Sequence, residues 1–184
     1  MIAALLLATA ATSCALTQDD LATNTKLTFA KFDQQLDVPS SARSLASRGC
    51  YAAAVQAYRH YLLFGPVGSD FERNVMRFHM GQYLADDGRE QEAATIIAAT
   101  RREIDPTRPT FDWNTYVIGT YAFLIKDRPL LDQMVATLSR SNQFGNRMNA
   151  WVLRRFQRCP NQPYRVAYGI DPRCSAADDP APKD

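Results

Sequence analysis

A spacing of 39 residues between three turns is the feature that most constrains the fold of this chain. Gly49, Gly88 and Asp127 each lie between two stretches of helical periodicity, 39 residues apart. The residues seven positions before each turn are small, and those four positions before it are large and apolar: Ala42, Gly81 and Thr120, then Leu45, Leu84 and Phe123. An equal period with matching positions predicts a stack of similar units. An irregular helical bundle with a coincidental spacing is the alternative.

The segments between the turns have apolar residues at helical spacing and no run of strand-like alternation. Tyr51, Ala54, Tyr58 and Tyr61 trace one helical face, and Ser69 followed by Glu72 is the capping-box pattern of a helix start. We expect helices over 24–36, around 51–62, and over 69–85, 90–102, 113–125, 129–138 and 148–156. The fold class is therefore predicted to be all-α.

Around Gly88 a small residue and a large one precede the turn, and Ala93, Ile97 and a closing Pro106 follow it. This pattern resembles the tetratricopeptide repeat, over roughly residues 36–142. The third unit departs from it, with Asp132 at the position of Ala93. The 39-residue period also exceeds the ~34 residues of the standard repeat, so the links must be longer. The resemblance implies a right-handed superhelix of antiparallel helix pairs, a tetratricopeptide-like α-solenoid, over residues 16–158.

The resemblance also implies a binding surface. The first helix of each pair in such repeats lines a concave face that binds extended peptides or partner helices. Counting back from the turns places Arg43, Gln82, Asn114 and Tyr121 on that face. A non-catalytic protein–protein interaction module with a protein partner is therefore the implied function. Residues 113–131 and the Cys-Pro…Cys ending also resemble a set of secreted bacterial helical-repeat proteins, which implies fold and compartment but no activity.

The first fifteen residues have the pattern of a signal peptide. They carry no charge, run apolar from Ile2 to Ala11 and then turn to small residues, and they are too short to span a bilayer. Ser13 and Ala15 predict cleavage after Ala15; a buried N-terminal helix is the alternative. Ser-Cys at 13–14 also resembles a lipobox, so lipidation at Cys14 is a second option. We expect a periplasmic or secreted protein, and an outer-membrane lipoprotein only if Cys14 is lipidated.

Three cysteines remain after such cleavage: Cys50, Cys159 and Cys174. Cys159 and Cys174 close a short Pro-rich loop with little helical pattern, and export favours a disulfide between them over two free thiols. Cys50 is then expected to be a buried free thiol. Residues 175–184 are polar and Pro-rich, which is typical of a disordered tail.

The sequence offers no strong chemical motif. The net charge of +2 gives no field that would attract nucleic acid. His60 and His79 are far apart in sequence, no Cys-x-x-Cys occurs, and the acids of 86–92 lack the order of a calcium loop. We predict no metal and no cofactor. The competing hypothesis is a cell-envelope hydrolase acting on glycan or peptide, with an acid such as Glu72 or Glu103 as its catalytic group.

Overall fold

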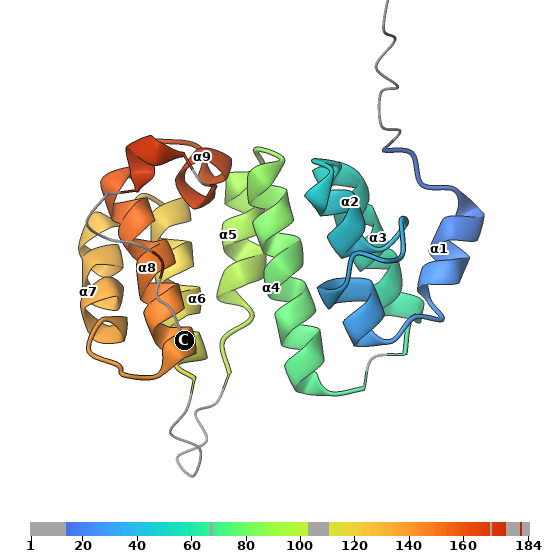
Figure 1. The fold of residues 1–184 in the computed structure, drawn as a ribbon, viewed down its shortest axis with the longest axis horizontal. Coiled ribbons are helices and arrows are strands. Elements are labelled where there is room, and N and C mark those ends of the chain that lie inside the picture. The colour runs from blue at the N-terminus through green and yellow to red at the C-terminus, as the bar shows by residue number, and fades with distance from the viewer. Residues whose placement is uncertain (1–13, 67, 103–110, 170, 176–180, 182–184) are drawn as a thin grey trace, which may run out of the picture.

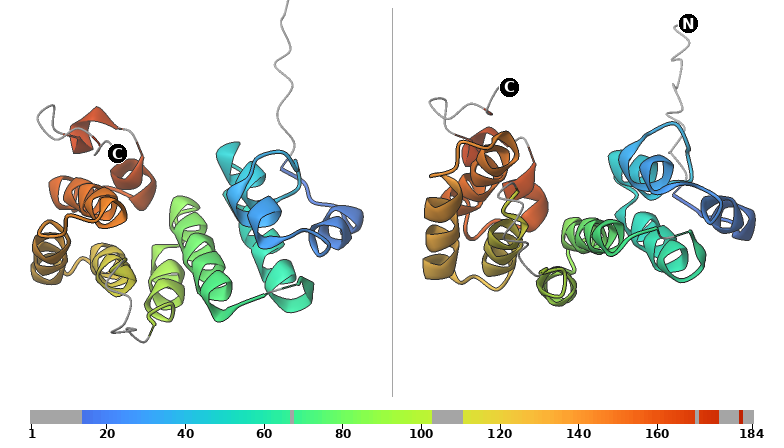
Figure 2. Two further views of the ribbon diagram at one scale, coloured as in Figure 1. Left: turned by 60° about the horizontal axis from the view of Figure 1, so that its bottom comes forward. Right: turned by 90° about the horizontal axis from the view of Figure 1, so that it is seen from below.

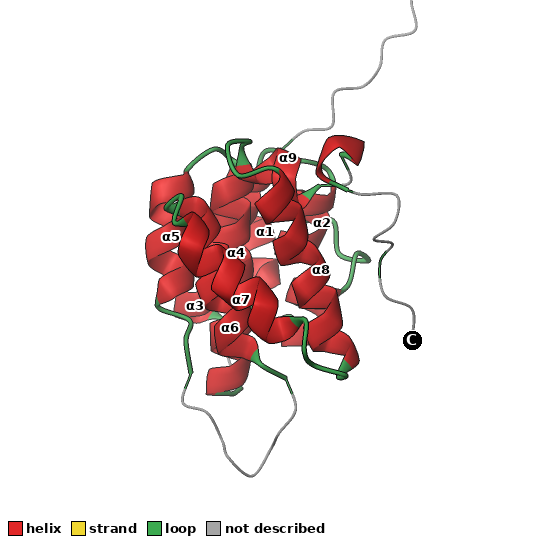
Figure 3. Ribbon diagram, turned by 90° about the vertical axis from the view of Figure 1, so that its left-hand side faces the viewer, coloured by secondary structure: helices red, strands yellow, loops and turns green. Residues whose placement is uncertain are grey.

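The computed structural model describes residues 14–66, 68–102, 111–169, 171–175 and 181 (Figure 1). Helices and loops make up these residues, and no strand occurs among them (Figure 3), so the all-α prediction is confirmed. The helices are α1 (Gln18–Asn24), α2 (Ala42–Ser47), α3 (Tyr51–Phe64), α4 (Asp70–Asp86), α5 (Glu90–Ala98), α6 (Trp113–Leu124), α7 (Arg128–Leu138), α8 (Phe144–Arg158) and α9 (Tyr164–Tyr168), with a π-helical turn η1 (Ala30–Gln34) and a 3₁₀ turn η2 (Pro172–Cys174).

Helix α4 begins at the predicted capping box. The Ser69 hydroxyl accepts the Glu72 backbone N–H at 3.2 Å, and the Glu72 carboxylate accepts the Ser69 N–H at 3.0 Å. Two side chains therefore satisfy backbone donors that the first helical turn leaves without a partner.

Several helix boundaries differ from the prediction. Helix α8 begins at Phe144 rather than at 148 and ends at Arg158 rather than at 156. The helix expected over 24–36 is interrupted: α1 ends at Asn24, and η1 follows after a gap. The buried Asn24 amide instead holds Ser40, donating to its carbonyl at 2.8 Å and accepting its hydroxyl at 3.0 Å. Helix α5 ends at Ala98 rather than at 102. The Thr100 hydroxyl donates to the Ile97 carbonyl, and the Thr100 carbonyl accepts the indole N–H of Trp113 at 2.8 Å.

Three turns between helices share one geometry. Gly49, Gly88 and Lys126 have φ of +79°, +83° and +63°. In each turn the next amide donates to a carbonyl five residues earlier, at 2.9 Å for Cys50 to Leu45 and at 2.8 Å for both Arg89 to Leu84 and Asp127 to Ala122. These are the bonds of a helix that ends in a left-handed residue. The third turn is therefore centred on Lys126, one residue before the predicted Asp127, which starts α7 as its N-cap.

This shift changes which residues of the third unit are in the core. Leu131 and Val135 are buried, at 2% and 7% exposure, whereas Asp132 and Ala136, which lie at the corresponding positions if the turn is centred on Asp127, are exposed. The small residue seven positions before the turn becomes Gly119 instead of Thr120. An ideal Cβ on Gly119 would lie 2.4 Å from Leu153 Cδ1, and one on Gly81 would lie 2.5 Å from Ile97 Cγ1. Both glycines allow a close approach of the neighbouring helix.

The helices from α2 to α8 pack each against the next and form a curved row. Figure 2 shows α1–α3 at one end, α6–α8 at the other, and α4 with α5 between them. Helix α9 folds back on the inner side of the curve, where it contacts both α4 and α8. The core is continuous along the row.

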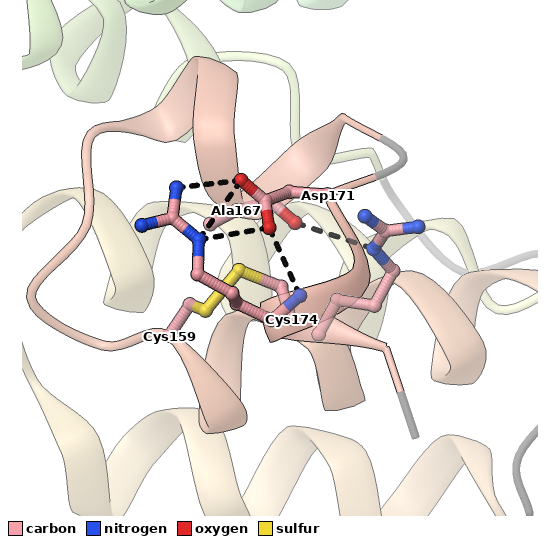
Figure 4. Close-up of a disulfide and its surroundings, with 6 residues drawn as sticks. Cys159, Ala167, Asp171 and Cys174 are labelled. Carbon is pink, nitrogen blue, oxygen red and sulfur yellow. Dashed lines mark hydrogen bonds and ion pairs between the residues drawn. A yellow bond between two sulfur atoms is a disulfide. The ribbon is translucent and has the colours of Figure 1, made fainter. Parts of the chain in front are cut away.

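The C-terminal segment is closed by the predicted Cys159–Cys174 disulfide, which is confirmed with a Cα–Cα distance of 5.5 Å (Figure 4). The segment contains the short helix α9, which we did not expect. Tyr164 is fully buried, and the buried Arg155 of α8 donates through Nε to the Ala167 carbonyl at 3.3 Å. The segment is therefore part of the core.

A second disulfide joins Cys14 to Cys50, with a Cα–Cα distance of 5.3 Å. The prediction of a free Cys50 thiol is wrong. It rests on cleavage after Ala15, which would remove Cys14 and leave Cys50 without a partner. A Cys14 sulfur in this bond cannot also carry the thioether of a lipid anchor. Residues 1–13 of the expected signal peptide, and the tail except 175 and 181, lie outside the described residues. No helix in the described ranges is long and apolar enough to cross a membrane.

Candidate binding surface on the inner side

The four predicted binding residues do not share one surface in the structure. Arg43 of α2 and Gln82 of α4 lie toward α9, where Gln82 Nε2 donates to the Tyr164 hydroxyl at 2.9 Å. Tyr121 of α6 is half-buried against the core. Asn114 lies by the opposite end of α4, because its amide binds the backbone of Arg102, whose guanidinium covers Phe71 in the first turn of α4.

The C-terminal segment occupies part of the inner side. Besides the bond from Gln82, the Tyr164 backbone N–H donates to the Glu90 carboxylate at 2.7 Å. Tyr164 has no exposed surface, and Gln82 is only 6% exposed. The Gln82 side chain is therefore covered by α9 and has little surface left for a partner. The remaining inner surface lies beside α9, along α2 and the last turns of α4.

Tyrosines and charged groups lie close together here, and we call this set the Asp86 surface: Arg43, Tyr51, Tyr83, Asp86, Arg165 and Tyr168. Tyr83 is largely covered by its neighbours, with 8% of its surface exposed. The rings of Tyr51 and Tyr83 are 6.3 Å apart, and Tyr168 is 39% exposed. Asp86 is half-buried in the last turn of α4 and has no ion pair within the described residues. Burial raises the pKa of Asp86 to about 7, although the charge of Arg165 acts in the opposite direction.

A buried network holds Arg43 at the edge of this surface. Asp33 is fully buried and accepts hydrogen bonds from the Tyr58 hydroxyl and from His79 Nδ1, which lies 2.9 Å away. The Asp33 carbonyl accepts Arg43 Nε at 2.7 Å. Burial would raise the pKa of Asp33, but the hydrogen bond and charge of His79, together with the Tyr58 hydroxyl, outweigh it and lower the pKa. Asp33 therefore stays ionised and fixes both the network and Arg43.

Sequence reasoning missed most of this surface. Asp33 is 25 residues from Tyr58 and 46 from His79, so no local pattern marks their contact. In the sequence, Asp86 stands out only as one of the acids of 86–92, which lack the order of a calcium loop. Among the described residues, no group of three or more His, Cys, Asp or Glu side chains could hold a metal ion. The signal that could have found the surface is Tyr83 and Asp86, one helical turn apart before the Gly88 turn.

The chemistry of the Asp86 surface suits recognition of a peptide. Tyrosine rings provide large contact areas with little loss of conformational entropy, and they are frequent among residues that dominate interface energies. A partly desolvated carboxylate gains more from a cation than one in bulk water. No protein-family model, curated protein or solved structure matches this chain. Functional inference therefore rests on its own residues.

Proposed function

We propose that this chain is an exported, non-catalytic protein-interaction module that binds a peptide or helix of an envelope partner through the inner side of its helices. The proposed scaffold is a tetratricopeptide-like right-handed superhelix. Three turns of one geometry, at Gly49, Gly88 and Lys126, support it. The close approaches of Gly81 to Ile97 of α5 and of Gly119 to Met134 of α7 support it as well, because repeat stacking needs small residues between paired helices.

One observation carries the binding function: Asp86 lacks an ion pair within the described residues, is partly buried and lies among tyrosines. An unpaired, partly buried carboxylate destabilises the free protein, and a cation from a partner would remove that penalty. The partner segment therefore carries a Lys or Arg side chain, flanked by apolar or aromatic residues that pack on the partly exposed Tyr51 and Tyr168. Arg43, held by Asp33, is placed to take an acceptor of the same segment.

Two disulfides support the exported location, because disulfides persist in oxidising compartments and are rare in the cytosol. Catalysis has less support. The carboxylate of Glu72, one of the two acids considered for a hydrolase, binds the backbone and hydroxyl of Ser69 at the start of α4. Glu103, the other acid, lies outside the described residues.

Photocrosslinking in the native envelope tests the proposal. A photoreactive amino acid replaces Tyr168 on the inner side or, as a control, Ala136 on the exposed face of α7. We expect position 168 to crosslink a partner segment that contains Lys or Arg, as read by mass spectrometry of the joined peptides.

Two charge reversals supply the matched comparison. Asp86→Lys should abolish the crosslink, whereas Asp87→Lys, at the exposed neighbouring residue, should retain it. Equal crosslinking from positions 168 and 136, or a crosslink that survives Asp86→Lys, would overturn the binding surface. Turnover of cell-wall fragments by the purified protein, abolished by a single Glu→Gln change, would replace the module with the hydrolase.

A further inference from the structure

A second surface lies at the opposite end of α4 from Asp86. An open hollow of about 430 Å³ is lined there by seven residues, which we call the arginine pocket: Asp70, Phe71, Arg73, Asn74, Arg77, Arg101 and Arg102. The lining includes four arginines and one acidic residue. The volume falls within the range of about 300–1,000 Å³ that is usual for small-molecule sites.

The convergence of these arginines follows from the path of the chain. Asp70, Arg73, Asn74 and Arg77 are spaced so that they share one face of α4. Helix α5 packs antiparallel to α4, so the chain that leaves α5 returns to the first turns of α4 and brings Arg101 and Arg102 there. Two separate segments therefore supply positive charge to one hollow.

Arg102 is fixed in this pocket more firmly than a surface arginine. Its backbone N–H donates to Asn114 Oδ1 at 2.8 Å, and its carbonyl accepts Asn114 Nδ2 at 2.6 Å. Its guanidinium carbon lies 4.7 Å from the ring centre of Phe71 and 4.6 Å from that of Trp113. Aromatic faces attract such a cation, so the guanidinium is oriented before any ligand arrives. Asn114, one of the predicted partner-binding residues, positions Arg102 through these two bonds.

The pocket has positive charge that the described residues do not neutralise. Within those residues, no ion pair joins Arg73, Arg77, Arg101 or Arg102 to an acidic side chain. Like charges held together repel, and an anion that enters the hollow relieves this repulsion. Guanidinium groups bind phosphate through paired N–H donors in a fixed plane, which makes phosphate the anion best matched to several arginines.

We infer that the arginine pocket binds a phosphate ester. Its phosphate lies among Arg73, Arg77 and Arg102, and the ring of Phe71, which is 53% exposed, covers the remainder of the ligand. The site is separate from the Asp86 surface, because even Arg77, the pocket residue nearest to Asp86 on α4, precedes it by nine positions, about 14 Å along the helix. The ester is either a soluble metabolite or a phospholipid headgroup, which present the same chemistry.

Calorimetric titration of the full chain with glycerol 3-phosphate tests this inference at low salt. We expect saturable binding that becomes about a hundredfold weaker in the Arg73→Gln/Arg77→Gln double variant, since each charged hydrogen bond is worth about a factor of ten. Arg140→Gln, at an exposed arginine in the turn after α7, should leave the affinity unchanged. Asp70→Asn should tighten binding severalfold, because it removes the carboxylate of the pocket.

Vesicle flotation distinguishes the two sources of phosphate. Binding to phosphatidylglycerol vesicles that needs Arg73 and Arg77 supports the inference with a lipid headgroup as ligand, and saturable binding of glycerol 3-phosphate without flotation supports it with a soluble ester. Failure to bind both glycerol 3-phosphate and the vesicles would overturn the inference. Equal weakening by Arg140→Gln and by the double variant would also overturn it, since general surface charge would then explain the binding.

Discussion

Lys126 is the residue that most directly tests the equivalence of the three turns. It has the left-handed conformation, with φ of +63°, that Gly49 and Gly88 adopt in the other two. An L-residue in this region costs about 1–2 kcal/mol, and glycine avoids most of that cost. Lys126→Gly should therefore relieve strain, and Gly88→Ala should introduce it. The two substitutions are opposite changes at equivalent positions of two turns.

The magnitude follows from what each side chain contacts. Lys126 Nζ lies 3.3 Å from Glu90 Oε2 and 4.4 Å from the ring centre of Phe123. These exposed contacts contribute about 1 kcal/mol together. Lys126→Ala loses them and keeps the strain, so we expect about 1 kcal/mol of destabilisation. Lys126→Gly also loses these contacts, but it relieves the strain. Part of that gain is offset by the greater conformational freedom of glycine in the unfolded chain, so its free energy of unfolding should be near that of the wild type.

The decisive quantity is the difference between Lys126→Gly and Lys126→Ala, about 1 kcal/mol in favour of glycine. At Gly88 an added Cβ would meet no atom within 4 Å, so Gly88→Ala isolates the backbone effect and should cost about 1 kcal/mol. Urea unfolding measures these differences, and thermal unfolding should show shifts of about 2–4 °C for each kcal/mol. An alanine variant at 126 as stable as the glycine variant would refute the assigned turn geometry.

Two further predictions concern Asp86 and the N-terminal disulfide. The pKa of Asp86 is raised from 3.8 to about 7 by burial, so the folded state favours the protonated carboxyl, and this contribution is lost as pH rises from about 4 through 7. Asp86→Asn should match the free energy of unfolding of the wild type near pH 4 and exceed it by about 2 kcal/mol above pH 7. This is half of what the full pKa shift corresponds to, because water reaches the carboxylate. Equal differences in urea unfolding at both pH values would contradict this prediction. Cys50→Ala should lower the free energy of unfolding by about 4 kcal/mol in the chain-entropy model, because it opens a bridge between residues 36 apart. Cys14→Ala should lower the free energy of unfolding by the same amount, and the Cys14→Ala/Cys50→Ala double variant should lower it no further. Reductant should remove the difference between these variants and the wild type that this bridge causes.

Local patterns in the sequence were sufficient for the central elements. Ser69 and Glu72 mark the start of α4 because a capping box needs only residues three apart. Gly49 and Gly88 mark two turns because glycine accepts the left-handed region at little cost. The Cys159–Cys174 bridge was predictable because it closes one short segment that has few other constraints.

The third turn shows where a local pattern stops being decisive. Neither Lys126 nor Asp127 is a glycine, so the sequence alone offered no reason to prefer one as the left-handed residue. The hydrogen bond from the Asp127 amide to the Ala122 carbonyl assigns that role to Lys126. One residue of difference rotates the whole of α7, and Leu131 enters the core in place of Asp132.

The sequence by itself determined the helical class, the turn at Gly88 and the C-terminal bridge, because each depends on energies between residues close along the chain. Only the tertiary structure decided the pairing of Cys14 with Cys50, the network around Asp33 and the convergence of Arg77 with Arg102. These contacts join separate elements, and the packing of α3, α4 and α5 determines which of their side chains meet. Helical periodicity specifies the buried face of each helix but not its neighbour.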